Sequence, residues 1–89
     1  MAKLKCSANA WEDYLFWQAH DKRVLKRLHA LFQECSRTPY EDMGKPEALR
    51  GNLHGWRSRR ITASDRMVYR MVSQAETLMI AQLRYHYDD

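Results

Sequence analysis

Three kinds of side chain in this sequence could together move protons and hold negative charge. Glu47 is a carboxylate that can accept a proton, and His86 is an imidazole that can donate or accept one, with an ordinary pKa of about 6.5. Arg60 and Arg66 are cations that can stabilise charge developing on a phosphate. This set suits cleavage of RNA without a metal ion, in which the ribose 2′-hydroxyl attacks the neighbouring phosphorus.

Neighbouring side chains extend this set to further contacts with an RNA strand. The candidate contacts are Lys45, Arg50, Arg59 and Tyr87. The cations can hold phosphate oxygens, and the tyrosine ring can stack on a base or orient the scissile bond. The same residues also have simpler interpretations. Glu47 could pair with a nearby cation in a loop, and His86 could be a frayed residue close to the C-terminus.

Positive charge is concentrated in one stretch of the chain. The 89 residues carry 15 Lys and Arg against 11 Asp and Glu, a formal net charge of +4. Residues 50–70 hold six arginines and one acidic residue, Asp65, a net charge of +5. Guanidinium groups match phosphate oxygens with two parallel hydrogen bonds, so this stretch favours a polyanionic ligand. A solvated strand face, or a patch for an acidic protein, is the alternative interpretation.

Length and composition indicate a single folded domain over residues 1–89, with 45% hydrophobic and 29% charged residues. The sequence has no apolar run long enough to span a bilayer and no signal-peptide pattern, so we expect a cytoplasmic protein without membrane association. Cys6 and Cys35 lie in no metal-binding spacing, and clustered carboxylates for two metal ions are missing. We therefore expect free thiols and no cofactor.

Hydrophobic periodicity predicts the elements in the first half of the chain. A short strand is expected over 3–6, followed by an aromatic–aliphatic helix capped by Ser7 or Asn9. Asp21 is expected to cap a second helix, whose apolar residues recur at spacings of three and four. That helix should end before Pro39, because proline disfavours helical geometry at the residue before it. An irregular loop is expected over 39–48.

Beyond that loop the period changes from 3.6 to 2, which predicts strands. The expected strands are 49–56, 57–62, 66–72 and 77–85. The side chains expected to pack against the helices are Met67, Tyr69, Met71, Met79, Ala81, Leu83 and Tyr85. Those expected on the opposite face are Arg66, Arg70, Arg84 and His86, with Arg60 as a further candidate. The fold class is α+β: β-α-α and then three or four antiparallel strands, with both helices on one face of the sheet.

Several short motifs are spread over the chain from Lys3 to Tyr87. They are 11–17 (WEDYLFW), 21–23 (DKR), 37–41 (RTPYE), 44–47 (GKPE), 59–62 (RRIT), 66–69 (RMVY) and 84–87 (RYHY). Together these motifs resemble the YoeB toxin family, within the RelE/ParE toxin superfamily. The resemblance implies a compact, microbial-RNase-like α+β fold. It also implies the toxin of a type II toxin–antitoxin pair, a ribosome-dependent endoribonuclease that cleaves messenger RNA in the ribosomal A site.

The resemblance also assigns roles to individual residues. It implies that Glu47 is the general base on the 2′-hydroxyl and that His86 is the general acid. Arg66 is expected to stabilise the phosphate and the transition state with help from Arg60, and Tyr87 to position the substrate. The partners implied are a YefM-type antitoxin, the ribosome with its messenger RNA, and a second copy of the chain in a homodimer.

The motifs depart from the familiar family pattern in a few places. Arg50 stands where we expect lysine, and Asp88 and Asp89 extend a chain that often stops at H-Y. A different function on the same fold is the alternative, namely a ParE-like toxin that inhibits DNA gyrase by binding alone. Glu47 and His86, together with an arginine, favour the enzyme because they supply a base, an acid and a cation.

Overall fold

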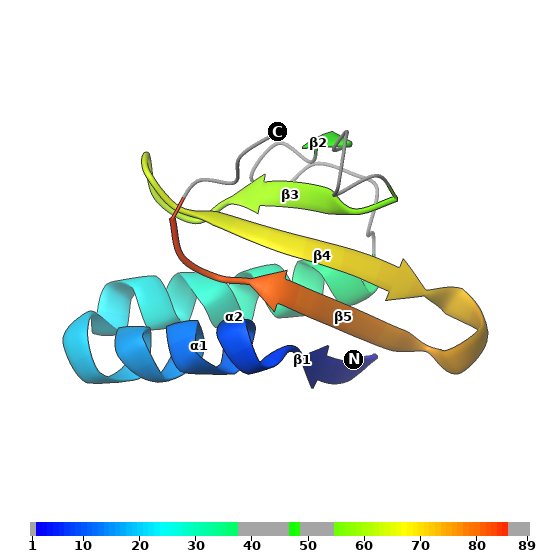
Figure 1. Cartoon of the computed structure of the whole chain (residues 1–89), viewed down its shortest axis with the longest axis horizontal. Helices are drawn as coiled ribbons and strands as arrows, with labels where there is room; N and C mark the ends of the chain where they lie inside the picture. The colour runs from blue at the N-terminus through cyan, green and yellow to red at the C-terminus, as the bar shows by residue number, and fades with distance from the viewer. Residues whose placement is uncertain (1, 38–46, 49–54, 86–89) are drawn as a thin grey trace.

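Two helices follow the first strand and lie on one face of the sheet (Figure 1). The computed structural model describes residues 2–37, 47–48 and 55–85. Strand β1 (Lys3–Cys6) leads into α1 (Ala8–His20). The Ser7 side chain caps α1 by accepting a hydrogen bond from the Ala10 amide, so Ser7 is the cap among the two candidates.

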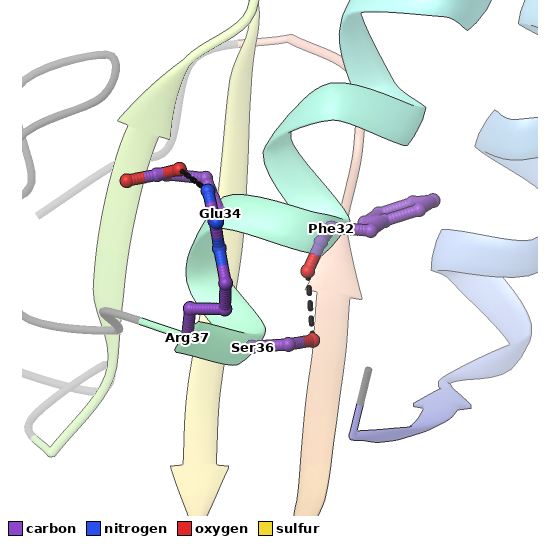
Figure 2. Close-up of polar contacts among 4 residues, drawn as sticks. All are labelled: Phe32, Glu34, Ser36 and Arg37. Carbon is purple, nitrogen blue, oxygen red and sulfur yellow. Dashed lines mark hydrogen bonds and ion pairs between the residues drawn. The ribbon is translucent and has the colours of Figure 1, made fainter.

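Helix α2 (Lys22–Arg37) has the predicted start and an end stabilised by its own side chains. One carboxylate oxygen of Asp21 accepts hydrogen bonds from the amides of Arg23 and Val24 at 3.0 and 3.2 Å. Figure 2 shows the other end, where the Ser36 hydroxyl donates to the Phe32 carbonyl at 2.8 Å. The Arg37 guanidinium also pairs there with the Glu34 carboxylate at 2.8 Å. The two bonds to Asp21 satisfy amides that a helix leaves unpaired in its first turn.

The sheet has five strands in the order β1-β5-β4-β3-β2. The remaining strands are β2 (Glu47–Ala48), β3 (Arg57–Arg60), β4 (Arg66–Val72) and β5 (Thr77–Gln82), with a 3₁₀ turn, η2 (Ser73–Ala75), before β5. β1 pairs with β5 in parallel, and the other neighbouring strands are antiparallel. The α+β class with two helices on one face is confirmed. The expectation of a wholly antiparallel sheet is wrong at its β1 edge.

Several strand boundaries differ from those predicted. The predicted loop 39–48 ends in strand β2. At the end of the predicted strand 49–56, Gly55 forms a turn with a φ of 90°, which favours glycine. Residues 38–46 and 49–54 lie outside the described part of the chain. β3 ends at Arg60 rather than at residue 62, and β5 ends at Gln82 rather than at residue 85.

The core lies between the helices and the sheet. Its buried members are Ala10, Trp17, Val24, Leu28, Leu31, Phe32, Cys35, Ile61, Met67, Tyr69, Leu78, Ile80 and Leu83. Met67 and Tyr69 confirm the predicted inward face of β4. Of the aromatic residues of α1, Trp17 is buried, whereas Trp11 is 53% exposed.

The prediction of which side chains face the core is wrong within β5 and right just beyond its end. Leu78 and Ile80 are buried rather than Met79 and Ala81. The register explains the difference: Tyr69 on β4 pairs with Ile80, whereas the preceding Val68 pairs with Gln82, so Ala81 is an extra residue. Such a bulge reverses the alternation. Beyond it, Leu83 faces the core, as predicted.

An apolar groove lies at the helix side of the molecule, near β1. It has a volume of about 810 Å³. It is lined by Leu4, Cys6, Trp11, Tyr14, Gln18, His29, Phe32 and Gln33. The Tyr14 hydroxyl and His29 Nε2 share a hydrogen bond of 2.9 Å across it. Neither helix in the described residues is long and apolar enough to cross a membrane.

Candidate active site

The face of the sheet turned away from the helices, called the open face below, carries a pair of arginines. Arg60 on β3 and Arg66 on β4 are direct register partners across the antiparallel ladder. Partners of this kind project their side chains from the same face, and like charges placed directly opposite each other destabilise a sheet. Arg60 is exposed and Arg66 is half-buried. The strand register therefore places these two cations side by side, which the alternation of side chains within each strand could not predict.

A third arginine adds to the positive charge of the open face. Arg70 lies on the same face of β4 as Arg66, and it is exposed. Among residues 2–37 and 55–85, neither of these arginines nor Arg60 forms an ion pair with a carboxylate. Three guanidinium groups on one face create a positive field that attracts anions.

Hydrogen bonds to the backbone orient the Arg66 side chain. Its Nη1 donates to the carbonyl oxygens of Thr62, Ala63 and Asp65 at 2.9, 3.3 and 3.1 Å. These carbonyls belong to the turn between β3 and β4, so the turn holds one end of the guanidinium before any substrate binds. A donor fixed in advance in this way can stabilise developing charge without reorganising.

The backbone of Glu47 lies on the edge strand next to β3, the strand that carries Arg60. Glu47 in β2 is the register partner of Ser58, and Ser58 in turn pairs with Val68 on β4. Ser58 precedes Arg60 by two residues on the same strand, so the two share a face. The structure thus brings the strand that contains the predicted base beside the strand that contains Arg60.

Arg59 lies on the other face and is fully buried. Its Nε donates to the Tyr69 hydroxyl at 3.2 Å. Its positive charge also acts to lower the pKa of the Cys35 thiol. Burial raises the pKa of the Tyr69 hydroxyl, although the hydrogen bond from Arg59 opposes that shift. Burial likewise raises the pKa of the Cys35 thiol to about 11. Arg59 therefore belongs to an interior polar cluster, which differs from its predicted place among the RNA contacts.

Arg84 also differs from its predicted place. Its guanidinium carbon stands 3.4 Å from the centroid of the Phe16 ring on α1 and 4.5 Å from that of the Tyr85 ring. Arg84 thus stacks on a helix residue, and the expectation that it lies on the face opposite the helices is wrong. Tyr85, which was expected to pack on the helices, is 61% exposed.

Three side chains make polar contacts around this site that the sequence did not predict. Asp13 on α1 is buried and accepts a hydrogen bond from the Leu83 amide at 3.0 Å. Burial raises the pKa of the Asp13 carboxyl, and the Leu83 bond opposes that shift. The Trp17 indole donates to the Leu83 carbonyl at 2.7 Å. Arg27 on α2 donates to the carbonyl of Arg60 at 3.1 Å. The signal for Asp13 was a carboxylate one helical turn before Trp17, on the buried side of a helix.

Four of the predicted site residues fall outside the described part of the chain. They are Lys45, Arg50, His86 and Tyr87. The described residues therefore supply the arginine pair, the backbone of Glu47 and the chain leading to residue 86.

Comparison with known proteins identifies the family. A model of the YoeB-like toxins of bacterial type II toxin–antitoxin systems matches residues 6–87. The chain belongs to the YoeB toxin family. One member, Toxin YoeB of Escherichia coli strain K12, is 48% identical over 85 residues, which cover 96% of this chain and 99% of that toxin.

Solved structures of YoeB toxins have the same fold. A YoeB/ParE toxin from Agrobacterium tumefaciens superposes with a TM-score of 0.91 at 42% identity, over 96% of this chain and 99% of the other. The toxin in a heterotetrameric YoeB–YefM complex from Staphylococcus aureus superposes with a TM-score of 0.88 at 36% identity, over 98% and 99%. A YoeB dimer from the same organism gives 0.87 at 38% identity, over 97% and 98%. The resemblance to YoeB toxins predicted from the motifs is confirmed.

Proposed function

We propose that this YoeB-family toxin is a ribosome-dependent endoribonuclease that cleaves messenger RNA in the ribosomal A site and so inhibits translation. The observation that carries the proposal is the cross-strand pair of Arg60 and Arg66 on the open face. Two cations held directly opposite each other, with no ion pair to a carboxylate among residues 2–37 and 55–85, form a site for a phosphate. Membership of a toxin family supports the biological role.

The proposed reaction needs no metal ion and moves two protons. Glu47 takes the proton of a ribose 2′-hydroxyl, and the resulting oxygen attacks the adjacent phosphorus. As that bond forms, the bond from phosphorus to the 5′-oxygen breaks, and His86 gives its proton to the departing oxygen. The products are a 2′,3′-cyclic phosphate and a 5′-hydroxyl, so atoms and charge balance. Each proton transfer of this kind contributes about 10²- to 10⁴-fold to a rate.

The remaining residues bind and stabilise the substrate in this proposal. Arg66 holds the charge on the phosphoryl oxygens in the transition state, and Arg60 assists it. Lys45 and Arg50 contact the RNA backbone, and Tyr87 stacks on a base or orients the scissile bond. Arg59 is not included among these contacts, because its guanidinium is buried beneath the sheet.

The ribosome is needed in this proposal because the toxin alone holds RNA too loosely. About four to six arginine contacts give weak and strongly salt-dependent affinity for a free single strand. In-line attack also requires the message to be bent into position, and a domain of 89 residues has little surface for that task. A ribosome that presents the message already positioned supplies this geometry as effective molarity.

The proposed protein partners follow from the solved relatives. The Staphylococcus aureus YoeB toxins occur in complex with YefM and as a dimer. We infer a YefM-type antitoxin for this chain, and a homodimer when that antitoxin is absent. The positive open face suits an acidic, partly disordered segment of such an antitoxin. The expected compartment is the cytoplasm, where translating ribosomes are found.

Primer-extension mapping of a reporter message in a reconstituted translation reaction tests this function. It compares the wild type with Glu47→Ala and His86→Gln, each with and without ribosomes. We expect cuts that require ribosomes and that weaken by at least about 100-fold in both variants. Cuts on naked RNA at physiological salt would refute ribosome dependence. No cuts under any condition would overturn the enzyme and make inhibition of DNA gyrase the next assay.

A further inference from the structure

Tyr85 presents an exposed aromatic ring on a fixed backbone. Its side chain is 61% exposed, the largest fraction among the large apolar side chains of the described residues. Its φ of 66° lies in the left-handed region, which strains a residue with a side chain. Its amide donates to Asp65 Oδ1 at 2.7 Å, and its carbonyl accepts from the Arg66 amide at 3.0 Å and from Gln82 Nε2 at 3.1 Å. These hydrogen bonds hold a strained backbone whose side chain lies largely in solvent.

The Tyr85 ring is the last layer of a column of stacked side chains. The guanidinium carbon of Arg84 lies over the Tyr85 ring, 4.5 Å from its centroid, and over the Phe16 ring, 3.4 Å from its centroid. The His20 ring also stacks on Phe16, with centroids 4.3 Å apart and planes inclined by 18°. The guanidinium and the imidazole are both too close to the Phe16 centroid to share one face of that ring. The column therefore begins on α1 and ends at Tyr85.

This column ends beside the arginine pair. The segment after β5 (red in Figure 1) runs to the turn between β3 and β4, where the Tyr85 carbonyl meets the Arg66 amide. Arg66 and its register partner Arg60 form the proposed phosphate site. In a nucleotide only one sugar separates the base from the phosphate. An RNA strand held by the arginine pair therefore has bases within reach of the residue next to Arg66.

The chemistry of the ring and the cation behind it suits an unpaired nucleobase. Bases of single-stranded RNA stack readily on exposed aromatic side chains. The Arg84 guanidinium offsets part of the negative charge of the Tyr85 π-system, so an electron-rich base meets less repulsion on the free face of the ring. The positive field of the open face attracts the same strand through its phosphates. Because the backbone is already fixed, little ordering of Tyr85 is needed on binding.

We propose that Tyr85 is a base-stacking platform for the message: one base of the codon in the ribosomal A site stacks on its exposed ring, which Arg84 supports from behind. This inference rests on the proposed function, which brings a message to the arginine pair. Tyr85 takes no part in proton transfer. Its ring holds a base, and the sugar of that nucleotide then restricts the orientation of the neighbouring phosphate.

The test is a mutant cycle between the Tyr85 ring and the bases of the message. Affinity is measured for ribosomes that carry a message with 2′-deoxy nucleotides in the A-site codon, so that binding is followed without attack by a 2′-hydroxyl. An abasic nucleotide then replaces each position of that codon in turn. Tyr85→Leu keeps an apolar side chain without a π face, and Tyr85→Gly removes the side chain. Tyr85→Phe is the matched control that keeps the ring.

We expect Tyr85→Leu and Tyr85→Gly to bind the intact message about tenfold more weakly, because stacking of one base on an aromatic side chain contributes about that factor or more. Tyr85→Phe should stay within about twofold of the wild type. At one codon position, the abasic message should weaken binding of the wild type by about tenfold, and there the two ring-deleting variants should lose nothing further. If Tyr85→Leu does not fold, Tyr85→Gly decides, since glycine accepts a positive φ without strain.

Three outcomes would overturn the inference while leaving the proposed function intact. They are an unchanged affinity in Tyr85→Leu and Tyr85→Gly, an equal loss in Tyr85→Phe, and a loss that persists on every abasic message, which would place the ring against the ribosome instead. A wild type that binds these ribosomes but does not cut an all-RNA message refutes the endoribonuclease, and the cycle still tests the stacking. A wild type that does not bind them removes both. The two failures are therefore distinguishable.

Discussion

Arginines on the two faces of the sheet have opposite environments. On the helix side, Arg59 is fully buried, and its guanidinium finds the hydroxyl of Tyr69 inside the protein. On the open face, the next residue, Arg60, stands opposite Arg66 without an ion pair to a carboxylate among residues 2–37 and 55–85. Neighbours of the same type thus differ only in which side of a pleated strand they occupy. The buried guanidinium contributes to the structure, and the opposed pair remains available to a ligand.

The same contrast extends to the apolar residues. Leu78 and Ile80 fill the helix side of β5, and the groove near Trp11 is on that side as well. On the open face, Val68 is buried although it points away from the helices. The open face thus combines an apolar centre with arginines at its ends. Predictions that alter one face at a time can separate stability from activity.

The largest expected effect is on the open face, from Arg66→Ala. Removal of this guanidinium should lower the ribosome-dependent cleavage rate by about 1,000-fold, because one fixed donor to a developing oxyanion contributes about that much. The matched control is Arg70→Ala, which removes an exposed arginine from the same strand and should change the rate by less than about threefold. Equal losses in the two variants would show that the face acts only through its overall charge.

On the helix side, Leu78→Ala should lower the free energy of unfolding by about 3 kcal/mol, because it leaves a cavity in the core. Its neighbour Met79 is only half-buried, and Met79→Ala should lower that free energy by less than about 1 kcal/mol. Urea denaturation measures both. The reverse ranking would mean that β5 has the register that the simple alternation predicts, without the bulge at Ala81.

Arg59→Ala should lower the free energy of unfolding by about 2 kcal/mol, since it leaves the Tyr69 hydroxyl without its buried donor. Arg60→Ala should lower it by less than about 0.5 kcal/mol and reduce cleavage instead. Urea denaturation and the cleavage assay together separate these outcomes. If the Arg59→Ala variant is stable but inactive, Arg59 contacts RNA, as the sequence suggested.

An effect of similar size, confined to high pH, concerns the thiol beneath Arg59. Burial raises the pKa of Cys35 to about 11 from an ordinary value of 9.0, so above pH 9 the unfolded chain binds fewer protons than the folded one. Stability is then fully present below pH 9 and is lost as the pH rises toward 11, by about 2 kcal/mol. Cys35→Ala should flatten this dependence in urea denaturation. A variant with the same slope as the wild type would contradict the assignment.

The sequence predicted the helices well and the sheet only in part, for physical reasons. Asp21 and the spacing of apolar residues define α2, because both act within a few residues along the chain. In β5, apolar residues occupy both faces at 78–81, so alternation cannot choose the inward side, and the bulge at Ala81 depends on pairing with β4. The parallel pairing of β1 depends on a strand more than 70 residues away.

The candidate site shows the same division. Alternation placed Arg66 on the open face, but its partnership with Arg60 required the register between two strands. Burial of Arg59 could not be foreseen, since arginine is seldom fully buried and its acceptor, Tyr69, lies on another strand. The hydrogen bond between Asp65 and Tyr85 likewise joins residues that are 20 apart in the sequence, and no local pattern predicts it.

The most direct test of the central claim removes the 2′-oxygen atom from the substrate. A short message is placed on ribosomes with either a normal or a 2′-deoxy nucleotide at the cleaved position, and single-turnover cleavage by the wild-type toxin is followed. If the open face promotes attack by the 2′-hydroxyl, the normal message is cut to a 2′,3′-cyclic phosphate and the deoxy message is not cut. Equal cleavage of the two messages would contradict the account.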